Sequence, residues 1–307
     1  MRIIVARHAG FCFGVQRAID VALEAVKERG RVYCIGPLIH NRQAVEDLAR
    51  QGLDVAESLE EVPVGAPVMV RTHGAGPELY EETRTRGHPL IDATCPFVLR
   101  AHKAAQAYQR DGFQVLVLGD REHPEAQGIV QHTGGEATIV EGPEEVESLK
   151  LSPRVALVCQ TTQRVERLQA LVQALLPRTR ELCVANTICD ATAQRQEASA
   201  ELARRVDVMI VVGGLHSANT SRLAQICSAT GTPTHHVETA DELRREWVEG
   251  AKVVGVSAGA STPDAAIEAV CRKLASFSGP DSEIEWPDRQ ADRRGDSRSG
   301  PSGSARG

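Results

Sequence analysis

Cys12, Cys95 and Cys189 are the residues of this chain best placed to do chemistry. Each lies at a turn beside Gly, Pro or Asp, where a strand-like run gives way to a helix-like segment. Binding sites of open α/β sheets collect at such strand ends. The other five cysteines fall inside apolar strand or helix patterns, where a thiol packs as a small hydrophobic side chain. These five structural cysteines are Cys34, Cys159, Cys183, Cys227 and Cys271.

The spacing of the three turn cysteines excludes the common compact metal sites. They are 83 and 94 residues apart, whereas zinc ribbons and bacterial ferredoxins take their ligands from close Cys-x-x-Cys pairs or runs. Thiolates select soft metals and iron-sulfur clusters. A [4Fe-4S] cluster held by three of them keeps one iron open, and an open coordination position is typical of a reactive metal site. Two alternatives stay open, a mononuclear zinc hydrolase with water in the fourth position and a non-catalytic iron-sulfur ligand sensor.

Histidine, hydroxyl and amide side chains follow several other strand-like runs. The histidines are His40 in "GPLIHN", His73 in "RTHG" and His123 in "GDREHPE". Donors close to helix N-termini suit a phosphate or diphosphate, because free backbone N–H groups and the helix dipole both favour an anion. A single loop histidine is more commonly solvated, but the repetition weakens that interpretation. Helix capping is the structural alternative for the remaining candidates, which are Ser217, Asn219 and Ser261.

Glu125 and Thr161 are the candidates for proton transfer. Glu125 lies two residues after His123, and a carboxyl group in a closed loop pocket can have a raised pKa and act as an acid near neutrality. Most glutamates at such positions are merely solvated. Thr161 in "CQTTQ" lies at another strand end, where a capping hydroxyl is the structural alternative. The G-x-G-x-x-G and P-loop patterns are absent, so nicotinamide or ATP binding has no sequence support.

The elements that must position these residues alternate between strands and helices. Short β-branched runs such as "APVMVRT", "FQVLVLG" and "DVMIVVGG" are typical of buried parallel strands. Amphipathic segments such as "CPFVLRAHKAAQAYQR" lie between them and predict helices. We therefore expect an α/β fold with mainly parallel sheets.

A weak internal repeat predicts the domain organisation. Asp-Ala-Thr lies beside a cysteine in both "IDATCP" and "NTICDAT". The cysteine spacing matches a small α/β unit, so we expect three such units in a pseudo-threefold arrangement, each contributing one cysteine to a central cluster. The expected domains are 1–95, 96–189 and 190–277. Residues 278–307 are rich in Gly, Pro, Ser and charge, and we expect a disordered tail.

Composition excludes several classes of protein. The chain has 307 residues, 42% hydrophobic and 25% charged, as expected of a globular protein. A net charge of -6 and only 3% aromatic residues argue against nucleic acid as a partner. The sequence has no apolar run of roughly 20 residues and no signal peptide, so we expect a cytoplasmic protein without a membrane partner. In that reducing compartment the eight cysteines do not predict disulfides.

The ordered motifs resemble those of the LytB family of 4-hydroxy-3-methylbut-2-enyl diphosphate reductases. They are "GFCFGV", "GPLIHN", "RTHG", "DATCP", "HPE", "QTT", "RQEA", "SANTSRL" and "AGASTPD", and they span residues 1 to about 275. The resemblance implies a [4Fe-4S] enzyme of the non-mevalonate isoprenoid pathway. Such an enzyme reductively removes the substrate's C4 hydroxyl, which gives isopentenyl and dimethylallyl diphosphate. It also implies reduced ferredoxin or flavodoxin as the electron donor.

The resemblance also implies roles for individual residues. Cys12, Cys95 and Cys189 match the cluster ligands, while Glu125, Thr161 and His123 match the catalytic positions. The positions implied to bind substrate are His40, His73, His123, Thr161, Ser217, Asn219 and Ser261. One departure is Ala218, where some relatives carry a second serine, so one hydrogen bond to the diphosphate is expected to be missing.

Overall fold

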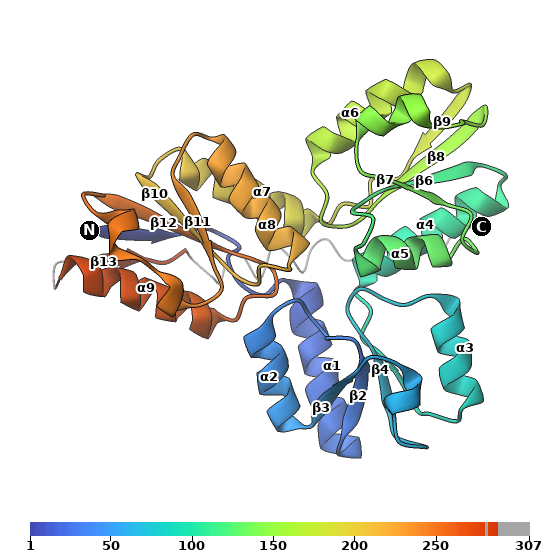
Figure 1. The fold of residues 1–307 in the computed structure, drawn as a ribbon, viewed down its shortest axis with the longest axis horizontal. Coiled ribbons are helices and arrows are strands. Elements are labelled where there is room, and N and C mark those ends of the chain that lie inside the picture. Colours follow the sequence, from blue (N-terminus) through green and yellow to red (C-terminus); the bar gives the residue numbers. More distant parts are fainter. Residues whose placement is uncertain (280–281, 288–307) are drawn as a thin grey trace, which may run out of the picture. The chain divides into compact units, whose positions relative to one another are not determined.

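The fold consists of three sheets of parallel strands, packed with helices and distributed over two compact units (Figure 1). The computed structural model describes residues 1–279 and 282–287. The central unit spans Gly14–Cys189, and the terminal unit joins Met1–Phe13 to the chain from Asp190 onward. The predicted α/β class with parallel sheets is confirmed. Within the described ranges, no helix is both long and apolar enough to cross a membrane.

The first sheet of the central unit has the strand order β3-β2-β4-β5. Its strands are short, and β4, one of its two inner strands, is fully buried, as expected of parallel strands covered by helices. The strands are β2 (Val32–Ile35), β3 (Leu53–Ala56), β4 (Val68–Val70) and β5 (Leu90–Asp92). The helices of this part are α1 (Phe13–Arg29), α2 (Arg42–Gln51) and α3 (Pro77–Thr85).

The second sheet of the central unit has the order β7-β6-β8-β9 and is covered on both faces. Alternate residues of β6 and β8 pack against α4 and α5 on one face and against α6 on the other. The strands are β6 (Gln114–Leu118), β7 (Thr138–Val140), β8 (Arg154–Cys159) and β9 (Glu181–Val184). The helices are α4 (Pro96–Arg110), α5 (Pro124–Gln131) and α6 (Val165–Leu175).

The sheet of the terminal unit has the order β11-β10-β12-β1-β13. Helix α9 packs on one face, and α7 and α8 pack on the other. The strands are β1 (Arg2–Val5), β10 (Val208–Val212), β11 (Thr234–Val237), β12 (Val253–Ala258) and β13 (Glu283–Glu285). The helices are α7 (Asp190–Ala203), α8 (Ala218–Ala229) and α9 (Asp264–Ser278).

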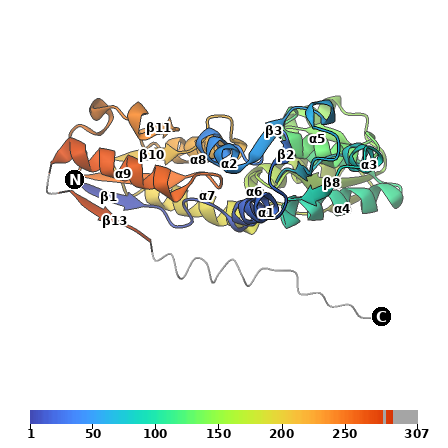
Figure 2. The same cartoon turned by 90° about the horizontal axis from the view of Figure 1, so that it is seen from below.

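The N-terminal strand lies outside the unit in which the sequence placed it. We expected residues 1–95 to form one unit, but β1 pairs in parallel with β12 and β13, and Figure 2 shows β13 beside β1. The apolar strand "RIIV" has two residues buried in the core of the terminal sheet, Ile3 and Val5. Burial of this strand requires a sheet that the chain completes only some 250 residues later, which no local pattern reveals.

The predicted tail contains a strand, β13, in the part that the structure describes. Ile284 of β13 packs against the terminal core, and β13 forms the edge of that sheet beside β1. The expectation of disorder from residue 278 therefore differs from the structure at Ser278, the last residue of α9, and at residues 283–285. Residues 280–281 and 288–307 of the predicted tail lie outside the described residues.

The three sheets repeat one topology. In each central sheet the four strands, numbered along the chain, lie in the order second, first, third, fourth. The terminal sheet has the same order for β10, β11 and β12, with β1 in the fourth position. The chain start thus supplies the strand that β5 and β9 supply in the central sheets. After each of these fourth-position strands comes one of the turn cysteines, and then a helix.

Candidate functional site

Each turn cysteine is anchored by the same backbone hydrogen bond. The amides of Cys12, Cys95 and Cys189 donate to carbonyl oxygens of residues 260, 72 and 161, at 3.1, 3.0 and 3.0 Å. Each acceptor lies two residues beyond the third-position strand of its own sheet, after β12, β4 and β8. Each of these third-strand loops carries a predicted substrate residue: they are Ser261, His73 and Thr161.

The loops after the first-position strands are equally alike. Gly36, Gly119 and Gly213 each donate a backbone hydrogen bond to the second-position strand, at 2.9, 3.1 and 2.9 Å. Four residues after each glycine stands another predicted site residue, and these are His40, His123 and Ser217. Polar candidates therefore occupy equivalent positions in all three sheets, at the carboxyl ends where binding residues of parallel sheets collect.

The three histidines of the central unit come together. Their ring centroids are 4.4 Å apart for His40 and His73, and 5.4 Å apart for each of these rings and His123. One nitrogen from each ring lies within 4.8 Å of the other two. Burial is the largest cause that lowers the pKa of His73 well below its usual value, and electrostatic repulsion from His40 and His123 lowers it further. The three histidines come from two different sheets, since His40 and His73 follow β2 and β4 and His123 follows β6.

Hydrogen bonding at His123 favours an anion over a metal ion as the ligand of this trio. Nδ1 of His123 accepts a hydrogen bond from the backbone N–H of Glu125 at 3.1 Å and so caps α5. The neutral ring must then carry its hydrogen on Nε2. A histidine that binds metal normally donates its second ring N–H to a neighbour, which His123 cannot do in this arrangement. Its Nε2–H is instead a fixed donor.

Glu125 and Thr161 form a buried pair. Oε1 of Glu125 accepts from the backbone N–H of Thr161 at 2.5 Å, and Oε2 accepts from Oγ1 of Thr161 at 2.9 Å. Glu125 is 2% exposed. Burial raises the pKa of Glu125 to about 7, although both hydrogen bonds from Thr161 act in the opposite direction. The pair therefore holds a proton close to neutral pH, as an acid catalyst requires.

The raised pKa of Glu125 predicts a specific pH dependence of stability. The pKa in the folded state lies above the ordinary value of 4.5, so this carboxyl contributes stability below pH 4.5 that is lost as pH rises through about 7. In Glu125→Gln that loss disappears. As pH rises from 5 to 8, the free energy of unfolding of the variant, measured with urea, should therefore increase relative to that of the wild type by about 3 kcal/mol or less. A pH-independent difference between the two proteins would contradict the shifted pKa.

The predicted substrate-binding residues of the terminal unit are all buried. Ser217, Asn219 and Ser261 are 5%, 5% and 7% exposed. The capping alternative applies to Ser217, because its Oγ accepts from the backbone N–H of Thr220 at 3.4 Å. Neither atom of the Asn219 side-chain amide has a hydrogen-bond partner in the described part of the chain. Because buried amides are normally satisfied, Asn219 is suited to receive a ligand.

The five cysteines assigned to packing lie where that assignment requires. Cys34, Cys159 and Cys227 are completely buried in their sheets or helices, and burial raises the pKa of each to about 12. Such thiols do not ionise near neutral pH. Cys271 is equally buried, in the terminal core, and Cys183 is partly buried on β9.

A stacked histidine pair next to the loop of His73 was not predicted. The rings of His102 and His132 stack with centroids 4.1 Å apart. His102 is 2% exposed and lies against Gly74, directly after His73. Burial is the largest cause that lowers the pKa of His102 to about 3, so it is a neutral packing residue. Its position on the buried face of α4 looks from the sequence like any core position, which is why no signal identified it.

Comparisons with known proteins agree with one another. The model of the LytB protein family matches residues 3–275. Proteins of Citrifermentans bemidjiense and Geobacter sulfurreducens, each named 4-hydroxy-3-methylbut-2-enyl diphosphate reductase, are 43% and 44% identical to this chain. Both alignments cover 90% of this chain and 98% of the relative.

Two solved structures are similar to this chain. One is (E)-4-hydroxy-3-methyl-but-2-enyl diphosphate reductase, described as the terminal enzyme of the non-mevalonate pathway. It is 43% identical with a TM-score of 0.66, over 89% of this chain and 98% of the other. The second is E-1-hydroxy-2-methyl-but-2-enyl-4-diphosphate reductase from Plasmodium falciparum, 24% identical with a TM-score of 0.87 over 94% and 92%. At that identity the second structure supports the fold alone.

Proposed function

Because this chain belongs to the LytB protein family, we propose that it reduces (E)-4-hydroxy-3-methylbut-2-enyl diphosphate to isopentenyl and dimethylallyl diphosphate. The family match confirms the resemblance drawn from the motifs. The observation that carries the proposal is the threefold repeat of the cysteine turn. Each cysteine amide is bonded to a loop that also carries a candidate substrate residue, so metal ligand and substrate donor are built into one local structure.

We assign Cys12, Cys95 and Cys189 as ligands of a [4Fe-4S] cluster with one open iron. The donor chemistry fits, because three thiol groups occupy equivalent positions while the buried cysteines of the strands are held protonated. A bound cluster would supply electrons and a Lewis-acidic iron for the substrate's hydroxyl group. We also propose domain boundaries near residues 95 and 189, next to two of these cysteines. They would divide the chain into three α/β domains, and β1 would belong to the third.

Glu125 supplies the proton with which the hydroxyl oxygen leaves as water. Thr161 donates to the carboxylate through Oγ1; when the carboxyl is protonated near neutrality, its O–H instead donates to Oγ1, and the Thr161 O–H donates to the substrate and passes on its own proton as it receives that of Glu125. The fixed Nε2–H of His123 orients the substrate by donation. A second proton must reach the remaining allyl fragment, and the end that receives it decides which product forms. Burial of the pair limits indiscriminate protonation by bulk water.

The histidine trio binds the diphosphate, together with Ser217, Asn219 and Ser261. Burial lowers the pKa of His73, and an anion stabilises protonated imidazole, so binding should raise that pKa and take up a proton. Calorimetric titration of the holoenzyme with inorganic pyrophosphate, in buffers of different ionisation enthalpy, measures that uptake. We expect affinity to rise as pH falls from 8 to 6.5. Binding without proton uptake, and with the same affinity throughout this range, would remove the trio from the diphosphate site.

An anaerobic assay tests the proposed reaction. The reconstituted protein is supplied with dithionite-reduced dye and the hydroxylated substrate, and both products are quantified. Dye oxidation that matches the formation of the two products supports the reductase. A colourless protein that contains zinc would favour the hydrolase, and substrate binding without dye oxidation would favour the sensor. We propose reduced ferredoxin or flavodoxin as the electron donor of this protein, and the cytoplasm as its location.

A further inference from the structure

The histidine trio alone leaves the diphosphate short of positive charge. Burial and mutual repulsion disfavour protonation of His73 in particular, and His123 donates as a neutral ring. A diphosphate carries several negative charges, and desolvating them without a counter-charge is costly. A permanent cation near these loops would reduce that cost.

Arg71 is such a cation. It lies two residues before His73, and its guanidinium is packed directly over the turn that leads to His40. A Cβ atom on residue 36 would lie 2.7 Å from Nη1 of Arg71, so a side chain at this position would displace the guanidinium from its place over the turn. Gly36 also has a φ of 71°, which a side chain disfavours. Gly36 thus leaves room for the guanidinium of Arg71 to lie against the loop of His40, while Arg71 itself belongs to the loop of His73.

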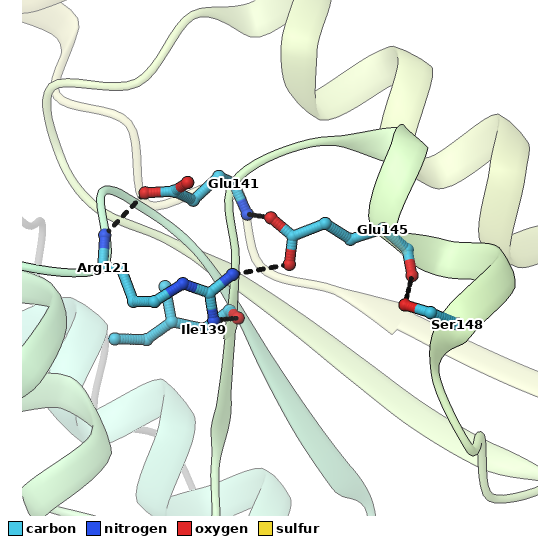
Figure 3. Close-up of polar contacts among 5 residues, drawn as sticks. All are labelled: Arg121, Ile139, Glu141, Glu145 and Ser148. Carbon is cyan, nitrogen blue, oxygen red and sulfur yellow. Dashed lines mark hydrogen bonds and ion pairs between the residues drawn. The ribbon is translucent and has the colours of Figure 1, made fainter.

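The charge of Arg71 is not neutralised within the described part of the chain. No carboxylate lies within ion-pair distance of its guanidinium there, and its electrostatic partners Glu57 and Cys34 act at longer range. Arg121, two residues before His123, provides the contrast. Its guanidinium donates to Glu145 at 2.7 Å and to the carbonyl of Ile139 at 3.3 Å (Figure 3).

The field of Arg71 reaches the trio. Its charge is one of the causes that lower the pKa of His73, after burial and the two neighbouring histidines. Arg71 also lines a cavity of about 390 Å³ beside the loop of Gly74. The same cavity offers the amides of Gln127 and Gln131, and one carboxylate, that of Glu122.

We propose that Arg71 is an electrostatic binding determinant for the diphosphate of the substrate, additional to the histidine, hydroxyl and amide donors. This inference rests on the proposed function, because it takes the diphosphate to bind at the trio. Arg71 attracts the anion and stabilises it at His40 and His73, and it takes no part in proton transfer. Its contribution should therefore appear in affinity and salt dependence, with the chemical step unchanged.

Pyrophosphate binding to the holoenzyme tests this inference without using turnover. In Arg71→Met we expect affinity for inorganic pyrophosphate to fall by roughly 10-fold or more. The dependence of affinity on salt should also become shallower. Arg71→Lys should restore part of both, because it restores the charge. Arg121→Met is the matched control and should bind like the wild type, because the Arg121 charge is already paired with Glu145.

Cluster absorbance and thermal unfolding show whether each variant is intact. Wild-type affinity and salt slope in Arg71→Met would overturn the inference. So would a loss that Arg71→Lys does not reduce, since that pattern means altered packing at Gly36. Failure of the proposed function is a separate result, namely absence of product from the hydroxylated substrate while pyrophosphate binding still depends on residue 71.

Discussion

Replacement of Glu125 by Gln should lower kcat by about 10²–10⁴-fold and leave iron content and pyrophosphate affinity close to those of the wild type. Glutamine can still accept from the Thr161 N–H and can donate to Oγ1, so both contacts of the carboxyl survive in altered form. What is lost is the transferable proton. Steady-state kinetics with reduced dye measure the effect.

The pH profile separates this role from a structural one. The acid must be protonated, so wild-type kcat should fall as pH rises through about 7, the pKa to which burial raises Glu125. The residual activity of Glu125→Gln should lack that inflection. Thr161→Val serves as the matched variant, since it removes the hydroxyl and keeps the backbone donor. Near-normal kcat in Glu125→Gln, or the same inflection in both proteins, would exclude Glu125 from the proton path.

Replacement of Cys95 by Ser should abolish both the cluster and the activity. Cys95 is the N-cap residue of α4, where serine is favoured, so the variant should fold. A [4Fe-4S] cluster held by two thiolates is not expected to survive purification. Iron and sulfide analysis after anaerobic reconstitution gives the result, and near-ultraviolet circular dichroism confirms the fold.

Cys34→Ala is the control for that experiment. Cys34 is fully buried in β2, and its thiol does not ionise near neutral pH because burial raises its pKa to about 12. Its removal costs some packing energy but should leave iron, sulfide and activity unchanged. Loss of iron from Cys34→Ala, or retention of a full cluster by Cys95→Ser, would show that the cysteines are wrongly sorted.

Much of the fold could be predicted because its signals are local. Buried parallel strands are short β-branched runs, and the turn cysteines stand beside Gly, Pro and Asp where strands end. The sequence also indicates that His40, His73 and His123 lie at the carboxyl ends of parallel strands, since all three follow strand-like runs. The domain assignment of β1 was not, because its partner β12 begins at Val253 and long-range pairing leaves no mark in the strand itself.

The limits at the site have a similar cause. The sequence identifies Glu125 as an acid candidate, but its raised pKa depends on complete burial and on Thr161, 36 residues away. The "RTHG" motif contains Arg71, yet two properties of packing are not visible in it: the lack of an ion-pair partner among the described residues and the position of the guanidinium over Gly36. Charge balance of this kind becomes visible only when neighbours in space are known.

The central claim is that three distant cysteines hold one cluster whose remaining iron is open to substrate. Iron and sulfide content, combined with Mössbauer spectra of iron-57 protein with and without substrate, tests it most directly. We expect about four irons per chain. One iron site should differ from the other three, and the spectrum of that site alone should change when substrate is added. Four equivalent irons that do not respond to substrate, or zinc in place of iron, would contradict the account.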